Sequence, residues 1–324
     1  MGSLDKIKAP ISKEMVKFDD LFKASMKSNV PLLNIITSYI LHRKGKQMRP
    51  MFVFLTAKLN GTITDNTYTA ASLIELLHTA TLVHDDVVDE AYERRGFFSI
   101  NALWRSKISV LMGDYLLTKG LLLSIDHKTY DLLEIVSEAV REMIEGELLQ
   151  IQRSRNMKIT SEQYFEIIRK KTATLISACA SCGAKSVGSD ANIVALMKQF
   201  GEYIGIAFQI KDDLFDYQAK GLIGKPTGND IKEKKLTLPL IFALEHSSIT
   251  ERKHILRTIN KNNTNSEKIK TIVDFVVSKG GLEYTSRMMY EYRDKAIEML
   301  SSYPESEIKT SLIDLVNYTI ERNK

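Results

Sequence analysis

The spacing of apolar residues predicts helices along almost the whole chain. In segment 66–90 the apolar residues recur at intervals of three and four, the spacing of one face of an α-helix: Leu73, Leu76, Leu77, Ala80, Val83 and Val87. The same spacing recurs in 99–124, 128–154, 160–183 and 190–218. The period-two alternation of strands hardly appears. The pattern therefore predicts an all-α protein of about a dozen helices.

Proline and glycine indicate where these helices stop. Residues 51–225 contain no proline, and because proline inside a helix costs ~3 kcal/mol, this stretch permits long helices. Asn60-Gly61 and Arg95-Gly96 are expected to end helices, and the polar run 261–266 is expected to separate two more. No shift in composition divides the chain, so residues 1–324 are expected to form a single domain.

The composition is that of an ordinary globular protein. Lys plus Arg number 45 and Asp plus Glu number 40, and the resulting net charge of +5 is too dilute to indicate nucleic-acid binding. No uncharged apolar run reaches the ~18 residues of a membrane span. Two cysteines in 324 residues indicate a reducing compartment, so we expect a cytoplasmic protein. Their lone C-x-x-C motif, Cys179–Cys182, lies among small residues and indicates close helix packing, because zinc would need two more ligands.

Two aspartate clusters carry the candidate chemistry. Each has the form D-D-x-x-D, with Asp85, Asp86 and Asp89 in the first and Asp212, Asp213 and Asp216 in the second. On a helix, the first and last aspartates of a cluster share a face one turn apart. Carboxylates held this close repel unless a cation intervenes, and oxygen ligands suit Mg²⁺ first. One such cluster is usually a solvated helix face, but two copies after apolar sequence indicate metal sites.

Basic residues accompany both clusters. They are Lys44, Lys46 and Arg49 before the first cluster, Arg94 and Arg95 just after it, and Lys170, Lys171, Lys225 and Lys235 around the second. Arginine binds phosphate oxygens bidentately, and lysine supplies a compact positive charge. The combination fits a diphosphate that Mg²⁺ bridges to aspartate, together with a second anion that is bound without metal.

In these motifs the chain resembles the trans-isoprenyl diphosphate synthases, the polyprenyl synthetase family. The family's motifs occur in its order between about Lys44 and Pro239: GKQMRP, ELLHTATLVHDDVVDEAYERRG, GDYLL, KKTATL, FQIKDDLFDY and GKPTGNDIKEKKLTLP. The resemblance implies the isoprenoid synthase fold, a class I terpene synthase-like helical bundle around a deep central cavity. It also implies a homodimer that condenses an allylic diphosphate, geranyl or farnesyl, with isopentenyl diphosphate.

The resemblance further implies roles for the residues that match these motifs. Asp85 and Asp89 would bind Mg²⁺ on the allylic diphosphate with Asp86 in support, and Asp212 would bind a third Mg²⁺ with Asp213 and Asp216 nearby. The allylic substrate would contact Arg94, Lys171, Thr172, Gln209, Lys225 and Lys235, and isopentenyl diphosphate would contact Lys46, Arg49, His78 and Arg95. The six aspartates and Lys171 are the catalytic candidates. Departures from the family pattern are Lys44, Gln47 and Lys234, the last of which stands where glycine is common.

Small residues before the first cluster bear on product length. Ala80 and Thr81 precede Asp85 by five and four positions, and Leu77 lies deeper on the same helix. Short-chain members of the family often place an aromatic residue at these positions. We therefore expect a medium or long product of six to eight isoprene units, which would be handed to membrane enzymes. The alternative is a short-chain farnesyl or geranylgeranyl diphosphate synthase.

Two further classes of protein fit these motifs less well. A class I terpene cyclase generally pairs one clear aspartate motif with an Asn/Ser/Glu-type motif, whereas this chain has two aspartate motifs. A non-catalytic subunit of a heteromeric synthase would be expected to lack aspartates or Arg94, and here they are present.

Overall fold

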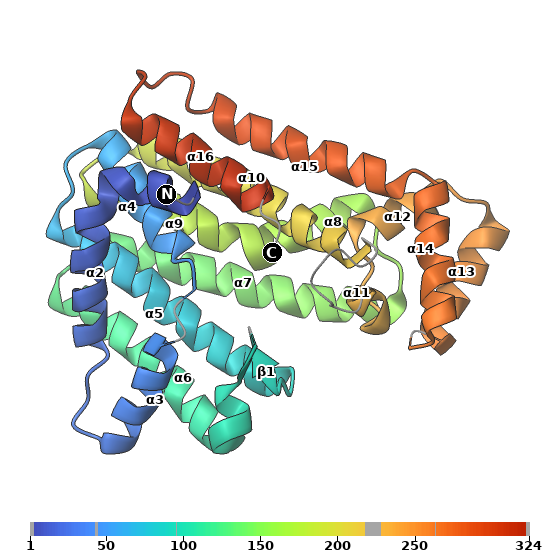
Figure 1. Cartoon of the computed structure of the whole chain (residues 1–324), viewed down its shortest axis with the longest axis horizontal. Helices are drawn as coiled ribbons and strands as arrows, with labels where there is room; N and C mark the ends of the chain where they lie inside the picture. The colour runs from blue at the N-terminus through green and yellow to red at the C-terminus, as the bar shows by residue number, and fades with distance from the viewer. Residues whose placement is uncertain (1–2, 43–44, 95, 218–227, 263, 322–324) are drawn as a thin grey trace. The chain divides into compact units, whose positions relative to one another are not determined.

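The computed structural model describes residues 3–42, 45–94, 96–217, 228–262 and 264–321, which are built almost entirely of helices (Figure 1). In chain order these are α1 (Ser3–Lys8), the 3-10 turn η1 (Ala9–Ile11), α2 (Ser12–Ser25), α3 (Pro31–His42), α4 (Met48–Asn60), α5 (Asp65–Val88), α6 (Ile100–Asp126), α7 (Tyr130–Asn156), α8 (Ser161–Ile168), the π-helical segment η2 (Arg169–Ala173), α9 (Thr174–Ser186), α10 (Ala191–Tyr217), α11 (Asn229–Lys232), α12 (Leu238–Glu245), α13 (Ile249–Asn262), α14 (Ser266–Ser278), α15 (Gly281–Glu298) and α16 (Glu307–Glu321). The two strands, β1 (Glu93–Arg94) and β2 (Phe97–Phe98), form one short antiparallel hairpin. The prediction of an all-α protein is confirmed.

Two of the sequence-based boundaries need correction. The helix expected to end at Arg95-Gly96 already stops at Val88, and β1 and β2 pair after it; Arg95 itself lies outside the described residues. Gly96 has φ of +78°, the left-handed conformation that a tight hairpin turn favours. Segment 160–183 is not one helix either, because η2 separates α8 from α9.

The described residues divide into two compact units by their contacts. The first unit takes residues 1–140, 178–198 and 303–315, and the second takes 141–177, 199–302 and 316–324. Helices α7, α9, α10 and α16 contribute residues to both units. The expectation of a single domain stays a prediction.

The core of the first unit forms around α4, which is buried without interruption from Pro50 to Ala57. A helix that is apolar on every side is stable only inside a protein. Gly183 of α9 lies so close to α4 that an added Cβ would overlap the Thr56 side chain. Cys179 and Cys182 precede Gly183 in α9 and are fully buried, with free thiols. The interpretation of the C-x-x-C motif as close helix packing is therefore confirmed.

The long helices α5 and α6 run side by side in the first unit (Figure 1). Gly120 of α6 faces Leu73 and Leu77 of α5, whose side-chain carbons would lie 3.4 Å from an added Cβ. This packing fixes the direction of α5, and with it the position of the first aspartate cluster at the end of the helix.

The second unit packs α12 against α15. A Cβ on Gly281 would overlap the carbonyl of Pro239, and the rings of Phe242 and Tyr284 stack at 4.1 Å between centroids. Its remaining elements include the carboxyl-terminal part of α10, which carries the second aspartate cluster, and the π-helical segment η2.

Candidate active site

The first aspartate cluster lies at the carboxyl end of α5. Asp85 and Asp86 are in its last turn, and Asp89 is the C-cap residue, whose N–H donates to the Asp85 carbonyl at 2.8 Å. The Asp85 and Asp89 side chains are exposed, whereas Asp86 is buried. The Asn101 side chain donates to the Asp86 carbonyl at 3.3 Å, tying the helix end to α6.

Both clusters occupy the end of a helix that least favours negative charge. The second cluster lies in the last turns of α10, which ends at Tyr217 directly after Asp216. The helix dipole places roughly half a negative charge at this end, and a carboxylate there loses ~0.3–1 kcal/mol. A cation bound at these helix ends would offset this cost, because it would reverse the sign of the interaction.

In the second cluster the three aspartates have different surroundings. Asp213 is buried, and its two oxygens accept hydrogen bonds from the Tyr164 hydroxyl at 2.5 Å and from Gln209 Nε2 at 2.8 Å. Asp216 accepts the backbone N–H groups of Asn229 and Asp230 at 2.8 and 2.9 Å, which fixes the start of α11. Asp212 is only half-buried. Asp213 and Asp216 therefore hold neighbouring protein groups in place around Asp212.

Burial shifts the acidity of two carboxyl groups here. Loss of solvent raises the pKa of Asp213 to about 7, against the opposing effect of its two hydrogen-bond donors. Burial and the charge of Asp216 raise the pKa of Asp230 to about 6, although Lys235 opposes the rise. Two carboxyl groups with raised pKa values favour a positive charge close by.

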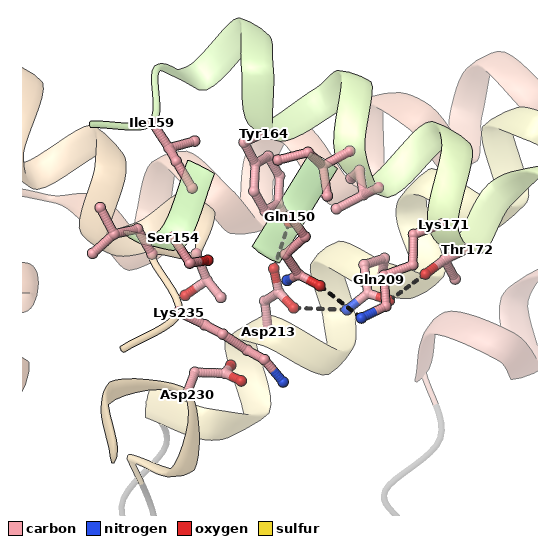
Figure 2. A pocket seen from close by; sticks show the side chains of 14 residues that line it. Gln150, Ser154, Ile159, Tyr164, Lys171, Thr172, Gln209, Asp213, Asp230 and Lys235 are labelled. Carbon is pink, nitrogen blue, oxygen red and sulfur yellow. Dashed lines mark hydrogen bonds between the residues drawn. The ribbon is translucent and has the colours of Figure 1, made fainter. Parts of the chain in front are cut away.

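A cavity of about 100 Å³ lies within the second unit, beside Asp213 (Figure 2). Its polar lining comes from α7, α8, η2, α10 and the segment around α11, and the residues are Gln150, Ser154, Tyr164, Lys171, Thr172, Gln209, Asp213, Asp230, Lys235 and Thr237. The sequence-predicted allylic contacts Lys171, Thr172, Gln209 and Lys235 are thus brought together. Lys225 lies outside the described residues.

The π-helical segment η2 presents Lys171 and Thr172 to this cavity. An added Cβ on Gly146 of α7 would lie only 2.6 Å from the Lys171 backbone nitrogen, so glycine permits the close approach. Lys171 pairs with Glu147 and donates to Gln150 Oε1 at 2.6 Å. Single π turns within helices are frequent at functional sites, and here the extra residue turns two neighbouring polar side chains inward.

Five polar residues of this cavity escaped the sequence analysis: Gln150, Ser154, Tyr164, Asp230 and Thr237. Gln150 and Tyr164 lie on ordinary amphipathic helices, where no spacing distinguishes them from surface or core residues. Asp230 was detectable, because it follows the glycine-rich run GKPTGN and precedes Lys235 by five residues. The backbone N–H of Lys235 donates to the Asp230 carbonyl at 2.8 Å. The Lys235 ammonium pairs with Glu233, and although burial lowers its pKa, Glu233 and Asp230 raise it on balance.

The residues predicted to hold isopentenyl diphosphate lie in the first unit, as far as they are described. Lys46 is exposed just before α4, and Arg49 is in the first turn of that helix. The Arg49 guanidinium lies 3.9 Å from Glu75, and its buried Nε has no hydrogen-bond partner among the described residues. A buried donor without a partner costs free energy that an anion would recover. His78 is buried on α5, and Arg95 lies outside the described residues.

Two departures from the family motif lie at positions where the backbone is left-handed. Gln47 has φ of 53°, and its side chain donates to Asp19 at 2.7 Å. Lys234 has φ of 57°, a conformation in which glycine is favoured, which accounts for the glycine that is common there. Lys44 and the side chain of Arg94 are not described, but the backbone of Arg94 lies in β1.

The three residues proposed for chain length differ in exposure. Ala80 and Leu77 are 1% and 2% exposed, so both are packed against neighbouring side chains. Thr81 is half-exposed, and its hydroxyl donates to the His78 carbonyl at 2.9 Å. Thr81 is therefore the residue of the three that borders open space.

The donor set of both clusters fits a hard divalent cation. Among the described residues, no three His, Cys, Asp or Glu side chains converge to enclose a metal ion. Mg²⁺ does not need such a cage, because it is usually bound by one or two carboxylates and completes its octahedron with water and substrate phosphates. Asp85 with Asp89, and Asp212, offer ligands of this kind at negative helix ends.

Helices that end in carboxylate clusters, one of them next to a cavity lined by lysine and hydroxyl groups, are the arrangement expected of a metal-dependent enzyme acting on diphosphate esters. The polyprenyl synthetase family model matches residues 30–276. The chain belongs to this family, and it is a trans-prenyltransferase. Family members generally depend on Mg²⁺.

Relatives match along the full length of the chain. Octaprenyl diphosphate synthase of Escherichia coli is 35% identical over 99% of this chain and 100% of its own. A decaprenyl diphosphate synthase structure from Rhodobacter capsulatus has a TM-score of 0.92 and 35% identity, covering 98% of both chains. A geranylgeranyl pyrophosphate synthase structure from Bacteroides thetaiotaomicron has a TM-score of 0.84 and 39% identity, covering 99% of this chain and 100% of that one. The predicted fold, family and enzyme class are confirmed, and the curated relatives favour a medium- or long-chain enzyme.

Proposed function

We propose that the chain condenses an allylic diphosphate with isopentenyl diphosphate and repeats the step to a product of six to eight isoprene units. The observation that carries the proposal is the pair of D-D-x-x-D clusters, each at the carboxyl end of a long helix. Full-length similarity to octaprenyl and decaprenyl diphosphate synthases supports the long product.

The allylic substrate would be ionised with metal bound to both clusters. Asp85 and Asp89 would hold two Mg²⁺ ions and Asp212 a third. When bound, Mg²⁺ stabilises negative charge on the leaving diphosphate. Lys171 and Lys235 would neutralise further charge as the carbon–oxygen bond breaks. Their carboxylate partners, Glu147 and Glu233, hold the two ammonium groups in the unit that contains the cavity until substrate arrives.

Isopentenyl diphosphate would bind without metal, to cations of the first unit. Arg49 and Lys46 lie at the amino end of α4, where the helix dipole favours an anion. The buried Arg49 Nε supplies a donor that no described residue uses. After the double bond attacks the allylic carbon, a proton must leave, and we propose the released diphosphate as its acceptor.

The short-chain alternative is a geranylgeranyl or farnesyl diphosphate synthase. It is favoured by one observation, the 39% identity to the Bacteroides geranylgeranyl pyrophosphate synthase. The absence of an aromatic side chain at Ala80 and Thr81 favours the longer product.

We further propose a cytoplasmic homodimer whose product passes to membrane enzymes. Helix α6 exposes Val110, Leu111, Leu121, Leu122 and Ile125, which fall within ~120° of one another at 100° per residue. It is also the one helix among the described residues with the length and apolarity of a membrane span, and a third of its apolar window is buried. The apolar face of α6 could therefore be a dimer interface or a membrane span, and two measurements distinguish them. A dimer that light scattering detects without detergent, and that Leu111→Glu and Leu122→Glu dissociate, supports the proposal. Protein that is recovered only in the membrane fraction contradicts it.

The condensation is tested by measuring release of inorganic diphosphate. The proposal predicts release only when farnesyl diphosphate, isopentenyl diphosphate and Mg²⁺ are all present, and none after chelation. Release from farnesyl diphosphate alone, with a cyclic or linear alcohol as product, would instead indicate a terpene cyclase.

A further inference from the structure

A chain of three hydrogen bonds connects Tyr164 to Thr172 in the second unit (Figure 2). The Tyr164 hydroxyl donates to Asp213 Oδ2 at 2.5 Å, and Gln209 Nε2 donates to Asp213 Oδ1 at 2.8 Å. The Thr172 hydroxyl then donates to Gln209 Oε1 at 2.8 Å. The four side chains come from α8, α10 and η2 and line one cavity.

The direction of these bonds is set at Asp213. In its ionised form, which predominates above the pKa of about 7 that burial gives it, Asp213 only accepts hydrogen bonds, so Gln209 must turn its NH₂ group toward Asp213. Its carbonyl oxygen then faces Thr172, whose hydroxyl must donate. An amide at position 213 whose oxygen still accepts from the Tyr164 hydroxyl would direct its NH₂ group to Gln209 and turn the glutamine over, which reverses this order.

We propose that Asp213 is a positioning residue and not a metal ligand: through Gln209 it sets the orientation of the Thr172 hydroxyl in the substrate cavity. Both of its carboxylate oxygens already accept from protein donors, and the side chain is 5% exposed. Tyr164 holds the carboxylate in place through the oxygen that Gln209 does not use. This inference rests on the proposed function and adds a role that the D-D-x-x-D pattern does not reveal.

The orientation determines what Thr172 can offer a ligand. Because its proton is directed to Gln209, the hydroxyl presents oxygen lone pairs to the cavity. Such an oxygen suits an ammonium group or a positively charged carbon, and it repels the oxygens of a diphosphate. Neighbouring Lys171 supplies the donors for the diphosphate instead.

Exchanging the carboxylate and the amide tests the direction. Asp213→Asn reverses the bonds, and we expect it to lower kcat/KM for farnesyl diphosphate about tenfold to a hundredfold, with KM for isopentenyl diphosphate unchanged. Gln209→Glu alone places two carboxylates in contact and should be impaired as well. The double variant Asp213→Asn/Gln209→Glu restores the original direction, since the new amide donates to the new carboxylate, which also accepts from the Thr172 hydroxyl. It should recover most of the loss.

Two outcomes would overturn the proposal. A double variant no more active than Asp213→Asn would show that direction is irrelevant, and a rise in the Mg²⁺ concentration for half-maximal rate in Asp213→Asn would indicate a metal ligand. The wild type, the two single variants and the double variant are also compared by urea unfolding without substrate. Here the double variant should have a higher free energy of unfolding than either single variant. This second arm decides the hydrogen-bond direction even if the wild type does not condense the two substrates, so failure of the proposed function is distinguishable. Tyr164→Phe, which leaves Gln209 unaltered, should be the mildest variant in both assays.

Discussion

At the scale of single residues, the three aspartates of the second D-D-x-x-D cluster have different roles. Asp216 accepts two backbone N–H groups of α11, and Asp213 is held between Tyr164 and Gln209. Asp212, which directly precedes Asp213, has a half-buried side chain. A motif of three identical residues thus contains one candidate metal ligand and two that organise the surrounding protein.

Alanine substitutions should separate these roles. Asp216→Ala leaves two backbone donors without an acceptor and should destabilise the fold by ~1–3 kcal/mol. Asp212→Ala and Asp85→Ala should leave the melting temperature nearly unchanged, or raise it slightly, because each removes a carboxylate from a negative helix end. Both should lower kcat by at least about a hundredfold. Thermal unfolding and steady-state rates under varied Mg²⁺ check this, and near-normal turnover in either Asp85→Ala or Asp212→Ala would contradict the metal assignment.

Backbone strain at Lys234 gives a second prediction. The left-handed conformation destabilises the folded state by ~1–2 kcal/mol at a non-glycine residue. Glycine removes this strain but loses more conformational entropy on folding, so about half of that free energy is recovered. Lys234→Gly should therefore raise the free energy of unfolding by about 0.5–1 kcal/mol. The control is Lys232→Gly at the last residue of α11, where no left-handed strain is relieved, so the free energy of unfolding should stay unchanged or fall by up to ~1 kcal/mol. If both substitutions destabilise equally in urea unfolding, the strain at residue 234 is absent.

Helix packing explains one break that the hydrophobic pattern does not show. Segment 160–183 has helical periodicity throughout, but η2 inserts a π turn at Arg169–Ala173. The sequence signal lies elsewhere, in glycines of two other helices: added Cβ atoms on Gly146 and Gly205 would meet the backbone of Lys171 and Ala173. Long periodic helices and their aspartate ends could be predicted from local spacing. A π turn that is set by distant glycines could not.

At the scale of helix packing, alanine substitutions at two glycines should change the free energy of unfolding in opposite directions. Gly146→Ala puts a methyl group 2.6 Å from the Lys171 backbone nitrogen, so η2 must shift, at a cost of ~1–3 kcal/mol. Gly120→Ala meets only leucine side-chain carbons at 3.4 Å and should gain up to about 1 kcal/mol from helix propensity. Unfolding free energies check the signs, and KM for the allylic substrate should rise only in Gly146→Ala. A neutral Gly146→Ala would contradict the close approach.

For the whole molecule, the family and reaction class could be predicted from ordered motifs, but the cavity contacts could not. Asp213 was predicted as a neighbour of the metal, and its pairing with Tyr164 brings together residues 49 positions apart. Arg94 was expected near a helix end, whereas its backbone lies in β1 and pairs with Phe97 of β2. Spacing identifies groups that share one element, and contacts between distant elements require the fold.

Product length should respond to the residues one turn before the metal cluster. Thr81 and Ala80 lie ~6 and ~7.5 Å before Asp85 along the helix axis. Thr81→Phe should shorten the product to three or four isoprene units while the first condensation remains active, because the half-exposed position accepts a ring. Ala80→Phe should do the same at a stability cost of ~1–3 kcal/mol, since Ala80 is packed. Unchanged product length in both folded variants would contradict this assignment.

The central claim is repeated, metal-dependent chain elongation, and one measurement tests it most directly. Labelled isopentenyl diphosphate is incubated with farnesyl diphosphate, Mg²⁺ and the purified protein, and the dephosphorylated products are separated by length. We predict incorporation that depends on Mg²⁺, with products concentrated at six to eight isoprene units. No incorporation would contradict the prenyltransferase reaction, and products that stop at four units would contradict the long-chain assignment in favour of a geranylgeranyl diphosphate synthase.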